Sequence, residues 1–521
     1  MKSLHYSDLL MNKLSIIVLS ASVFWSQPVR ANLNSKLLNR QNQESLNQKS
    51  HLVQNFRQNR QEVDQEQNIP QTISDIEVSF VDSEDRVVNS KTNPNLITRE
   101  FELKPGDTYD GKLAQKGLTG VNDLIFVERA SLEFEPARTG NIKVVVKVIE
   151  SNPLFFSLGG ISPPSALQGP IHPQTVSPSD NEGNGIGNSF RVGVNNLGGS
   201  NQSLSLGVSG GEQNFGLDLD YRKFIKHDTG FAANIFTDRN VEPEFDEGEI
   251  EINLPDGDDP WVNRNGGGVE YFQPISGDWL GALGVNYQLV SLRDGAFTGQ
   301  LEPLDELGNS LTVSDDGQDP LLTVNFVTSL DRRNNPSNAT TGYRLAFETA
   351  QSIPIGDANI LSNRLAANYT HYIPTPLFGF TKGDRTLVLN LQAGTILGDV
   401  PPFEAFNLGG SSSIRGFSGG EVGTGRSFVQ ATAEYRFPIF GFTAFEEKFD
   451  IDGNLFVDYG SLFSTQDNVI GQPGIVRDKP GDGLGYGLGL RTLTSVGIVK
   501  LEFALNNEGG SEVIFQLGDR F

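Results

Sequence analysis

The chain of 521 residues has no cysteine, only five histidines and only two methionines. The lack of cysteine excludes disulfide scaffolds, thiol nucleophiles and cysteine-ligated zinc, and so few histidines argue against a histidine-rich metal site. Basic residues are also scarce, with 40 Lys and Arg against 64 Asp and Glu and a formal net charge of −24. Nucleic-acid binding is therefore not expected, because it requires clustered basic side chains facing phosphate.

The patterns of common catalytic sites are missing as well. Ser-His-Asp chemistry needs a positioned histidine, but His172, His227 and His371 fall in a proline-rich loop, a short turn and a strand, without a nucleophile elbow nearby. The glycine-rich run 183–187 lacks the strand and helix of a phosphate-binding loop. We therefore expect no enzyme, no catalytic residues, no metal and no cofactor.

The acidic excess is concentrated between Asp238 and Asp259, where ten carboxylates stand beside one arginine. Hard oxygen ligands suit calcium, but the segment has no EF-hand spacing. A solvated acidic loop is the simpler interpretation, and a calcium site stays open as the alternative.

The first 71 residues are of two kinds. An apolar run from Leu14 to Trp25 follows lysines and precedes a small residue, Ala31. It is shorter than the about 20 residues of a membrane helix and is typical of a secretion signal, so we predict a signal peptide over residues 1–31. A buried N-terminal helix is the alternative. Seventeen of the 40 residues in 32–71 are Asn or Gln, which predicts a flexible linker.

Residues 72–152 predict a small α+β domain in the order strand, helix, helix, strand, strand. Asn93 and Pro94 are suited to begin a helix. Apolar or small side chains then recur at helical spacing, which predicts the buried face of a second helix. These are Leu113, Gly117, Val121 and Leu124. About 80 residues are enough for an independent core.

From residue 153 apolar and polar residues alternate. Leu217, Leu219 and Tyr221 share one face, for example, while charged residues occupy the other. Period two with one apolar face predicts strands, and charges on the opposite face of many strands fit a water-filled lumen. We predict sixteen strands in residues 153–521, with 14 or 18 as alternatives. Their ranges are 154–161, 188–198, 201–210, 212–222, 229–239, 263–273, 278–292, 320–331, 342–352, 361–374, 384–397, 427–440, 449–460, 481–492, 495–506 and 511–521.

The predicted connections alternate in length. Those after odd-numbered strands include long segments rich in Gly, Pro, Asn and Asp, whereas those after even-numbered strands are mostly short. The long segments are 162–187, 240–262, 293–319, 398–426 and 461–480. Long outer loops and short periplasmic turns are typical of outer-membrane barrels. The predicted fold class is therefore an all-β transmembrane protein: a closed 16-stranded antiparallel outer-membrane β-barrel with one N-terminal periplasmic α+β domain.

The last predicted strand ends in an aromatic residue. Phe515, Leu517 and Phe521 are expected on its outward face, although Asp519 departs from the pattern. A terminal aromatic strand is what outer-membrane barrels present for their own assembly, so these residues are a candidate assembly signal.

One loop segment, FNLGGSSSIRGF over residues 406–417, ends in the tetrad Ile414, Arg415, Gly416 and Phe417. The motifs AEYRFP (433–438) and FVDYG (456–460) follow on the next two predicted strands. In these motifs and their order, the chain resembles the outer-membrane barrel-assembly superfamily, typified by BamA, TamA and the two-partner-secretion translocators. Residues 72–152 resemble its POTRA domain, so the resemblance covers the whole chain beyond the linker.

The resemblance implies that Arg415 locks its loop in the lumen against Glu434 and Asp458. The residues fit this role, because alternation places both carboxylates on the lumen side of adjacent strands. Glycines such as Gly409 and Gly416 allow tight turns, and an arginine fork meets carboxylates bidentately. The alternative is that Arg415 is a solvated loop charge.

The function that this resemblance implies is assembly, insertion or translocation of other proteins, with client strands received by the POTRA domain and passed on at the barrel seam. One alternative is a two-partner-secretion-type pore dedicated to one exported protein, and a second is a diffusion porin. The expected partners are unfolded outer-membrane or secreted clients, outer-membrane lipids and accessory periplasmic proteins. The expected location is the outer membrane of a Gram-negative-type cell or a plastid outer envelope, with the POTRA domain in the periplasm.

Overall fold

The computed structural model describes residues 71–137, 141–158, 189–211, 213–336, 338–444, 447–494 and 497–521. The expected signal peptide (1–31) and nearly all of the expected linker (32–71) lie outside the described residues. Residues 71–521 form one compact unit. Within the described part of the chain, no helix has both the length and the apolar character needed to cross a bilayer.

The N-terminal part is an α+β unit with the expected element order. Its elements are β1 (Ile73–Phe80), α3 (Asn95–Thr98), α4 (Gly111–Asn122), β2 (Val127–Pro136) and β3 (Ile142–Glu150). The central strand β3 runs parallel to β1 and antiparallel to β2. Helix α4 begins after Asp110, whose carboxylate accepts hydrogen bonds from the backbone N–H groups of Lys112 and Leu113, a side-chain cap. Its face with Gly117 and Val121 is buried, as the spacing predicts.

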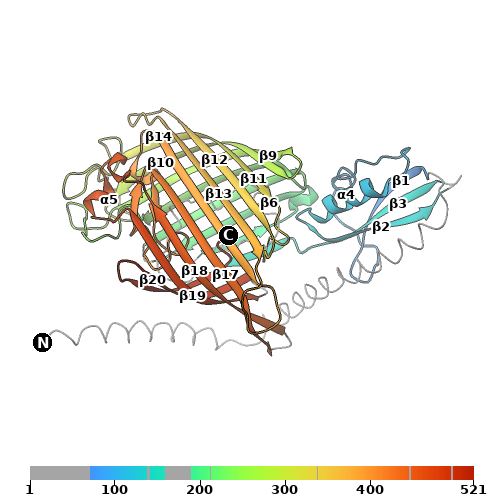
Figure 1. The fold of residues 1–521 in the computed structure, drawn as a ribbon. Coiled ribbons are helices and arrows are strands. Elements are labelled where there is room, and N and C mark those ends of the chain that lie inside the picture. Colours follow the sequence, from blue (N-terminus) through green and yellow to red (C-terminus); the bar gives the residue numbers. More distant parts are fainter. Residues whose placement is uncertain are drawn as a thin grey trace, which may run out of the picture. The chain divides into compact units, whose positions relative to one another are not determined.

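Among the described residues, sixteen strands then form a single antiparallel sheet, which confirms the predicted number (Figure 1). They are β4 (Leu154–Leu158), β5 (Ser189–Val194), β6 (Gln202–Gly210), β7 (Asn214–Lys226), β8 (Thr229–Val241), β9 (Trp261–Ser276), β10 (Trp279–Arg293), β11 (Gln318–Asp331), β12 (Gly342–Ile353), β13 (Ser362–Pro374), β14 (Thr386–Gly398), β17 (Ser427–Ala444), β18 (Glu447–Ser461), β19 (Asp482–Thr494), β20 (Gly497–Asn506) and β21 (Ser511–Leu517). Neighbours in the sheet follow chain order, with β14 beside β17.

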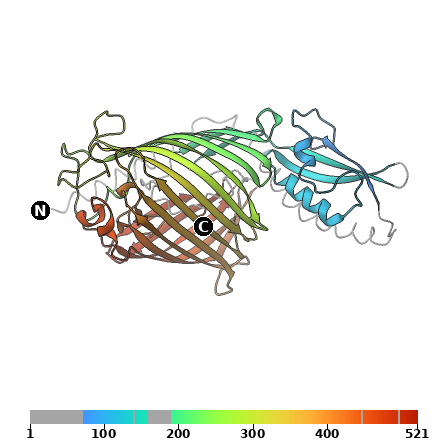
Figure 2. The ribbon, with the colours of Figure 1, turned by 90° about the horizontal axis from the view of Figure 1, so that it is seen from above.

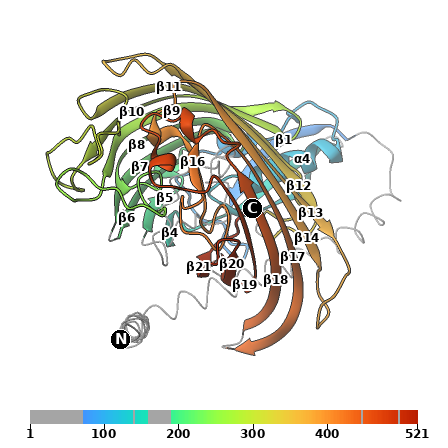
Figure 3. The same ribbon diagram turned by 60° about the vertical axis from the view of Figure 1, so that its left-hand side comes forward.

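The predicted closure of the barrel is wrong for this structure, because β4 and β21 are the two edges of the sheet and do not pair within the part of the chain that the structure describes. The edge strand β21 is short, with seven residues. The predicted last strand, 511–521, is also too long. At Gly518 the backbone takes a φ of +101°, a left-handed conformation that favours glycine, and β21 ends there. The C-terminus lies inside the curve of the sheet (Figure 3).

The two ends of the sheet differ in their connections. We call the end where β3 leads into β4 the near end and the opposite end the far end. Near-end turns such as 227–228 and 277–278 are short, whereas far-end loops such as 242–260 and 399–426 are long, as the alternation of loop lengths predicts. Figure 2 shows these far-end loops clustered beyond the strand ends.

The far-end loop between β14 and β17 contains two strands that the sequence analysis missed. β15 (Phe406–Leu408) and β16 (Gly423–Gly425) pair antiparallel as a separate two-stranded sheet. Around them is a cluster of buried apolar side chains from the loop and the adjoining strands: Ala366, Ile396, Val400, Ala405, Phe406, Leu408, Ile414, Phe417, Val422, Phe428, Leu462 and Val469. This small core holds the loop in a defined shape against the inner face of the sheet.

Candidate functional site

The tetrad loop turns into the lumen through glycines. Gly409 and Gly416 have φ angles of +118° and +93°, which disfavour any side chain. A Cβ on Gly416 would stand 2.8 Å from the Leu505 carbonyl, and one on Gly485 would stand 1.9 Å from the Arg415 carbonyl oxygen. Glycines in both the loop and β19 therefore let the two backbones approach closely.

Ile414 and Phe417, which flank Arg415 and Gly416, are anchors of this loop. Both are fully buried in the apolar cluster around β15 and β16. Space for them comes again from strand glycines, since a Cβ on Gly460 would stand 2.7 Å from Ile414 and one on Gly483 would stand 2.9 Å from Phe417. The tetrad thus combines two apolar anchors, one arginine and one glycine at a left-handed position.

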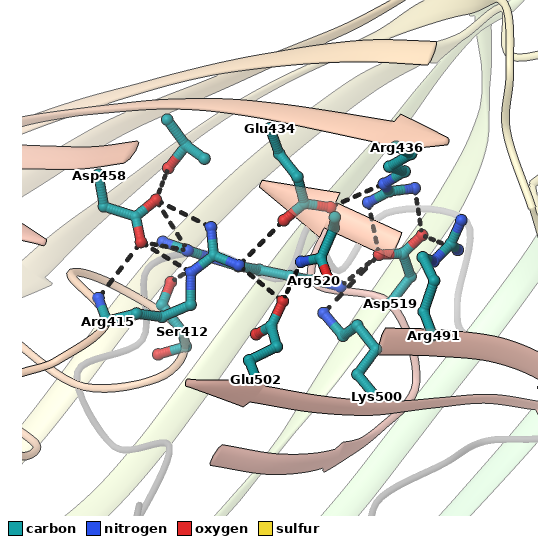
Figure 4. Close-up of polar contacts among 12 residues, drawn as sticks. Ser412, Arg415, Glu434, Arg436, Asp458, Arg491, Lys500, Glu502, Asp519 and Arg520 are labelled. Carbon is teal, nitrogen blue, oxygen red and sulfur yellow. Dashed lines mark hydrogen bonds and ion pairs between the residues drawn. The ribbon is translucent and has the colours of Figure 1, made fainter. Parts of the chain in front are cut away.

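Arg415 is completely buried, and the structure brings it together with both carboxylates named from the sequence (Figure 4). Its Nε and Nη2 lie 2.7 and 3.1 Å from the two carboxylate oxygens of Asp458. Its Nη1 lies 2.9 Å from Glu434. The Asp458 pair has the bidentate geometry that suits a guanidinium. The alternative of a solvated Arg415 is wrong.

A third carboxylate completes the site and was missed in the sequence analysis. Glu502 of β20 accepts a hydrogen bond of 2.9 Å from Nη1 of Arg415. The Arg415 guanidinium also lies 3.4 Å from the centre of the Phe456 ring, a cation–π arrangement. Strict alternation in β20 places Lys500 and Glu502 on the lumen side, so the period-two pattern could have identified Glu502.

The network continues from Glu434 to a second cluster of charges. Arg436 Nε donates to Glu434 at 2.7 Å, and its Nη1 and Nη2 both donate to Asp519 at 2.9 Å. Arg491 also contacts Asp519, at 3.4 Å. We call the whole set the lumen network: Arg415, Glu434, Arg436, Asp458, Arg491, Lys500, Glu502, Asp519 and Arg520. It contains five cations and four anions, so its charges nearly cancel.

The C-terminal residues belong to this site rather than to the outer surface. Phe515 is 42% exposed on the outward face, but Phe521 is only 8% exposed and packs with Tyr372 and Val388 inside the sheet. The expectation that Phe515, Leu517 and Phe521 share one face is therefore wrong, because the turn at Gly518 redirects the chain. Arg520 points to the tetrad loop: its Nη1 lies 3.2 Å from both carboxylate oxygens of Asp458, and its Nε donates to the Ser412 carbonyl at 3.1 Å.

The electrostatics favour the charged forms of Arg415 and Asp519, two of the three network members that lie outside the strands. Burial lowers the pKa of Arg415, but the carboxylates of Asp458, Glu502 and Glu434 outweigh burial and raise this pKa above its ordinary value. Burial raises the pKa of Asp519, but Arg436 and its neighbours outweigh it and lower the pKa to about 2. Each group keeps its charge because its partners are present, so removal of one partner leaves an uncompensated buried charge.

A second polar cluster ties the far-end loops together. Arg264 donates to both carboxylate oxygens of Glu242, at 2.6 and 2.7 Å, and to the Phe403 carbonyl at 2.6 Å. Lys479 Nζ donates to the carbonyls of Pro243 and Asp246, at 2.7 and 2.6 Å. The interpretation of residues 238–259 as a solvated acidic loop is thus wrong in part, since Glu242 is only 2% exposed. In the described ranges of the chain, no group of three or more His, Cys, Asp or Glu is arranged to hold a metal ion.

Comparisons with known proteins agree with this architecture. A family model described as the Omp85 superfamily domain matches residues 196–521. Outer envelope protein 80 of Arabidopsis thaliana chloroplasts is 26% identical over 453 residues, which cover 86% of this chain and 57% of that protein. The chloroplast protein TOC75 of Pisum sativum is 24% identical over 480 residues, covering 86% of this chain and 56% of that protein. The chain thus spans little more than half the length of these relatives.

Two solved structures have the same fold. BamA from Haemophilus ducreyi lacking POTRA domains 1–3 matches with a TM-score of 0.56 and 16% identity, over 84% of this chain and 83% of that one. CdiB from Acinetobacter baumannii matches with a TM-score of 0.51 and 15% identity, over 85% of this chain and 73% of that one.

Proposed function

The chain belongs to the Omp85 superfamily, and from this premise we propose that it is an outer-membrane or plastid outer-envelope factor that inserts other proteins into the membrane or moves them across it. The observation that carries the proposal is the combination of two sheet edges, β4 and β21, which pair with no further strand among the described residues, with a lumen network that holds both the tetrad loop and the C-terminal residues. A client strand can pair with either edge. The network keeps the tetrad loop and the C-terminal residues in the lumen.

Unpaired edges are suited to client binding because they present free N–H and C=O groups to an added strand. β4 and β21 lie at the two sides of one seam in a sheet that curves toward closure. A client strand that adds to either edge gains backbone hydrogen bonds and reaches the lipid through the same gap. Because the turn at Gly518 keeps β21 short, few backbone hydrogen bonds hold β21 to β20.

We further propose that residues 72–152 are a POTRA domain on the periplasmic side and receive the client first. The sheet order β1-β3-β2 makes β1 and β2 the edge strands of this unit among the described residues. Backbone hydrogen bonds from residues 106–107 and 88 cover the two ends of β1. Strand β2 carries Phe134, which is 49% exposed, beside such an edge. An extended client segment could therefore add to this sheet by backbone pairing, with an aromatic contact to support it.

The unit also packs on the near end of the sheet. Arg99 donates to the Phe224 carbonyl at 3.1 Å, and Phe224 and Phe272 belong to the same buried cluster as the core of the unit. Phe224 and Phe272 are 2% and 1% exposed. Removal of the unit would therefore uncover both rings.

A dedicated translocator for one exported protein is the second candidate, since the tetrad and the two strand motifs that follow it also resemble those of the two-partner-secretion translocators. A diffusion porin is a weaker candidate, because the tetrad loop and the C-terminal residues fill part of the interior with buried side chains. An open diffusion pore needs a water-filled lumen.

Depletion of the protein followed by comparison of the outer-membrane and secreted proteomes tests the proposal. Loss of many barrel proteins supports a general assembly factor, and loss of one exported protein supports a dedicated translocator. A change in solute uptake with both proteomes intact contradicts the proposal and supports a porin. A further variant carries proline substitutions that block the edges of β1 and β2, and it is expressed in cells depleted of the wild-type protein. It separates the contribution of residues 72–152 from that of the 16-stranded sheet.

A further inference from the structure

Strand β17 extends beyond its neighbour at the near end. Its last pair with β14 joins Arg436 to Thr386, yet β17 continues to Ala444. Beyond Arg436 it pairs only with β18, with a bulge between Pro438 and Phe440. At about 3.3 Å per residue, these additional residues make an overhang of roughly 25 Å along the strand. The sheet therefore ends here in a projecting two-stranded hairpin.

The outward face of this hairpin is aromatic. Phe440 pairs with Ile451, and Phe442 pairs with Phe449, so all four side chains share one face. Phe440 and Phe442 are 50% and 45% exposed. The Phe442 and Phe449 rings stack with their centres 5.4 Å apart.

The near-end connection 375–385 lies against the same face. The backbone N–H of Phe380 donates to the Pro438 carbonyl at 2.8 Å. The Tyr435 hydroxyl donates to the Phe378 carbonyl at 2.7 Å and accepts from the Phe378 N–H at 3.1 Å. These bonds fix the connection over β17, where a neighbouring strand would otherwise continue.

This connection adds its own apolar side chains to the face. Phe378 contacts Phe437, with ring centres 4.7 Å apart, while Leu377 and Phe380 are 70% and 74% exposed. We call the combined surface the aromatic apron: Leu377, Phe378, Phe380, Tyr435, Phe437, Phe440, Phe442 and Phe449. Other near-end connections are polar, such as 277–278 (Gly-Asp) and 332–341 (RRNNPSNATT).

Exposure of the apron to water would be energetically unfavourable. A two-stranded hairpin is marginally stable in water, and a contiguous exposed apolar patch marks a surface that contacts something else. The apron continues, along β17 and β18, the outward face that carries Ala433, Leu455 and Val457. In a membrane-spanning sheet that face contacts lipid. Continuity with the lipid-facing wall therefore identifies the partner as lipid rather than protein.

We propose that the aromatic apron inserts into the near-side lipid leaflet, at the boundary between acyl chains and head groups, and fixes the depth of the wall formed by β17 and β18. Aromatic side chains favour this boundary in membrane proteins generally. The proposal extends beyond the handling of clients, and it can be tested in vesicles without any client.

Because the chain has no cysteine, a single introduced cysteine can be labelled specifically to measure its depth in the bilayer. Phe380→Cys and Phe442→Cys, each labelled with the fluorophore NBD, are reconstituted into phosphatidylcholine vesicles that contain lipids with a nitroxide quencher at a shallow or a deep acyl position. Val457→Cys, in the middle of the wall, is the deep control, and Asp278→Cys, in the polar β9–β10 turn, is the aqueous control. Heat-modifiable gel mobility verifies that each labelled variant is folded.

We expect labels at positions 380 and 442 to be quenched more by the shallow than by the deep nitroxide, and to be protected from iodide in the water. The label at 457 should show the opposite depth preference, and the label at 278 should be quenched by iodide only. If the labels at 380 and 442 behave as the label at 278 does, the apron lies in water and the proposal is wrong. Protection from iodide without lipid quenching would also overturn it, in favour of a protein partner.

Discussion

The wall from β17 to β20 and the wall from β4 to β7 both hold an arginine between two carboxylates, but in different surroundings. Arg415 and its partners Glu434 and Asp458 are fully buried. Arg191 pairs with Asp218 and Asp220 on the other wall, where the three side chains are 27–32% exposed. Buried pairs are costly to break, whereas exposed pairs contribute little. The same chemistry thus fixes a loop on one wall and contributes little stability to the other.

The strands also differ in length. β17 and β18 have 18 and 15 residues, whereas the edge strand β21 has seven. Each residue pair in a ladder contributes backbone hydrogen bonds, so pairing weakens from β17 and β18, which carry Glu434 and Asp458, toward the seam at β21.

The largest expected effect is that of Arg415→Ala. It leaves Glu434, Asp458 and Glu502 without their shared cation, at a cost of about 3–5 kcal/mol for a broken buried pair. We expect loop 399–426 to become sensitive to external protease and the heat-modifiable form to unfold at lower temperature. Arg415→Lys should rescue only in part, because an ammonium cannot form the two-pronged contact with Asp458.

Arg191→Ala is the matched control for this prediction. Its pairs are partly exposed, so we expect a loss of about 0–1 kcal/mol and an unchanged loop. The double variant with Glu434→Gln and Asp458→Asn should have an effect similar to that of Arg415→Ala, and the effects should not add, since all three residues act in one network. Equal behaviour of Arg415→Ala and Arg191→Ala would show that burial does not distinguish the two walls.

A smaller effect is expected for Arg520→Ala. It removes the contacts of the C-terminal segment with Asp458 and the Ser412 carbonyl, but Asp458 keeps Arg415 as a partner. We expect the C-terminal residues to leave the lumen while the tetrad loop stays protected. Carboxypeptidase sensitivity reports the first event and loop proteolysis the second. Simultaneous release of both would show that the two segments form one indivisible unit.

The seam itself can be probed with cysteines at Phe156 and Phe515, which are 64% and 42% exposed on the edge strands. We expect a crosslink between them, and between each and the neighbouring positions of the other strand, because no ladder fixes their register. Full client handling by a protein crosslinked in one single register would contradict release of clients at the seam. Gel mobility of the crosslinked forms and client levels provide the two measurements.

The smallest effect concerns the near end, where His227 Nδ1 lies 2.7 Å from a carboxylate oxygen of Glu100. This hydrogen bond raises the pKa of His227, while burial opposes it. Stability gained from a raised histidine pKa is complete below the ordinary value of about 6.5 and is lost as pH rises through the folded-state pKa. We expect the rate of trypsin cleavage after Arg99 in the wild-type protein to increase with pH relative to the rate in the His227→Gln variant, which lacks the titrating group. A constant ratio of the two cleavage rates at all pH values would contradict this linkage.

Much of the fold follows from the sequence because each strand has one lipid-facing and one lumen-facing side. This alternation predicted all sixteen strands. It also placed Glu434 and Asp458 on the lumen-facing side of two adjacent strands. It could not place Asp519 and Arg520, because a turn at Gly518 interrupts a pattern that otherwise continues to Phe521. β15 and β16, with three residues each, are too short to show a period. The overhang of β17 was missed because alternation specifies which side a residue faces and not where the neighbouring strand stops.

The position of Arg520 has a mechanical consequence. Arg520 follows the edge strand β21 by three residues and shares Asp458 with Arg415. A force that pulls β21 sideways is therefore transmitted through Gly518 and Asp519 to the same carboxylate that holds the tetrad loop. The edge and the loop are thus mechanically coupled through Asp458. By reciprocity, a displaced loop lowers the work needed to move the edge.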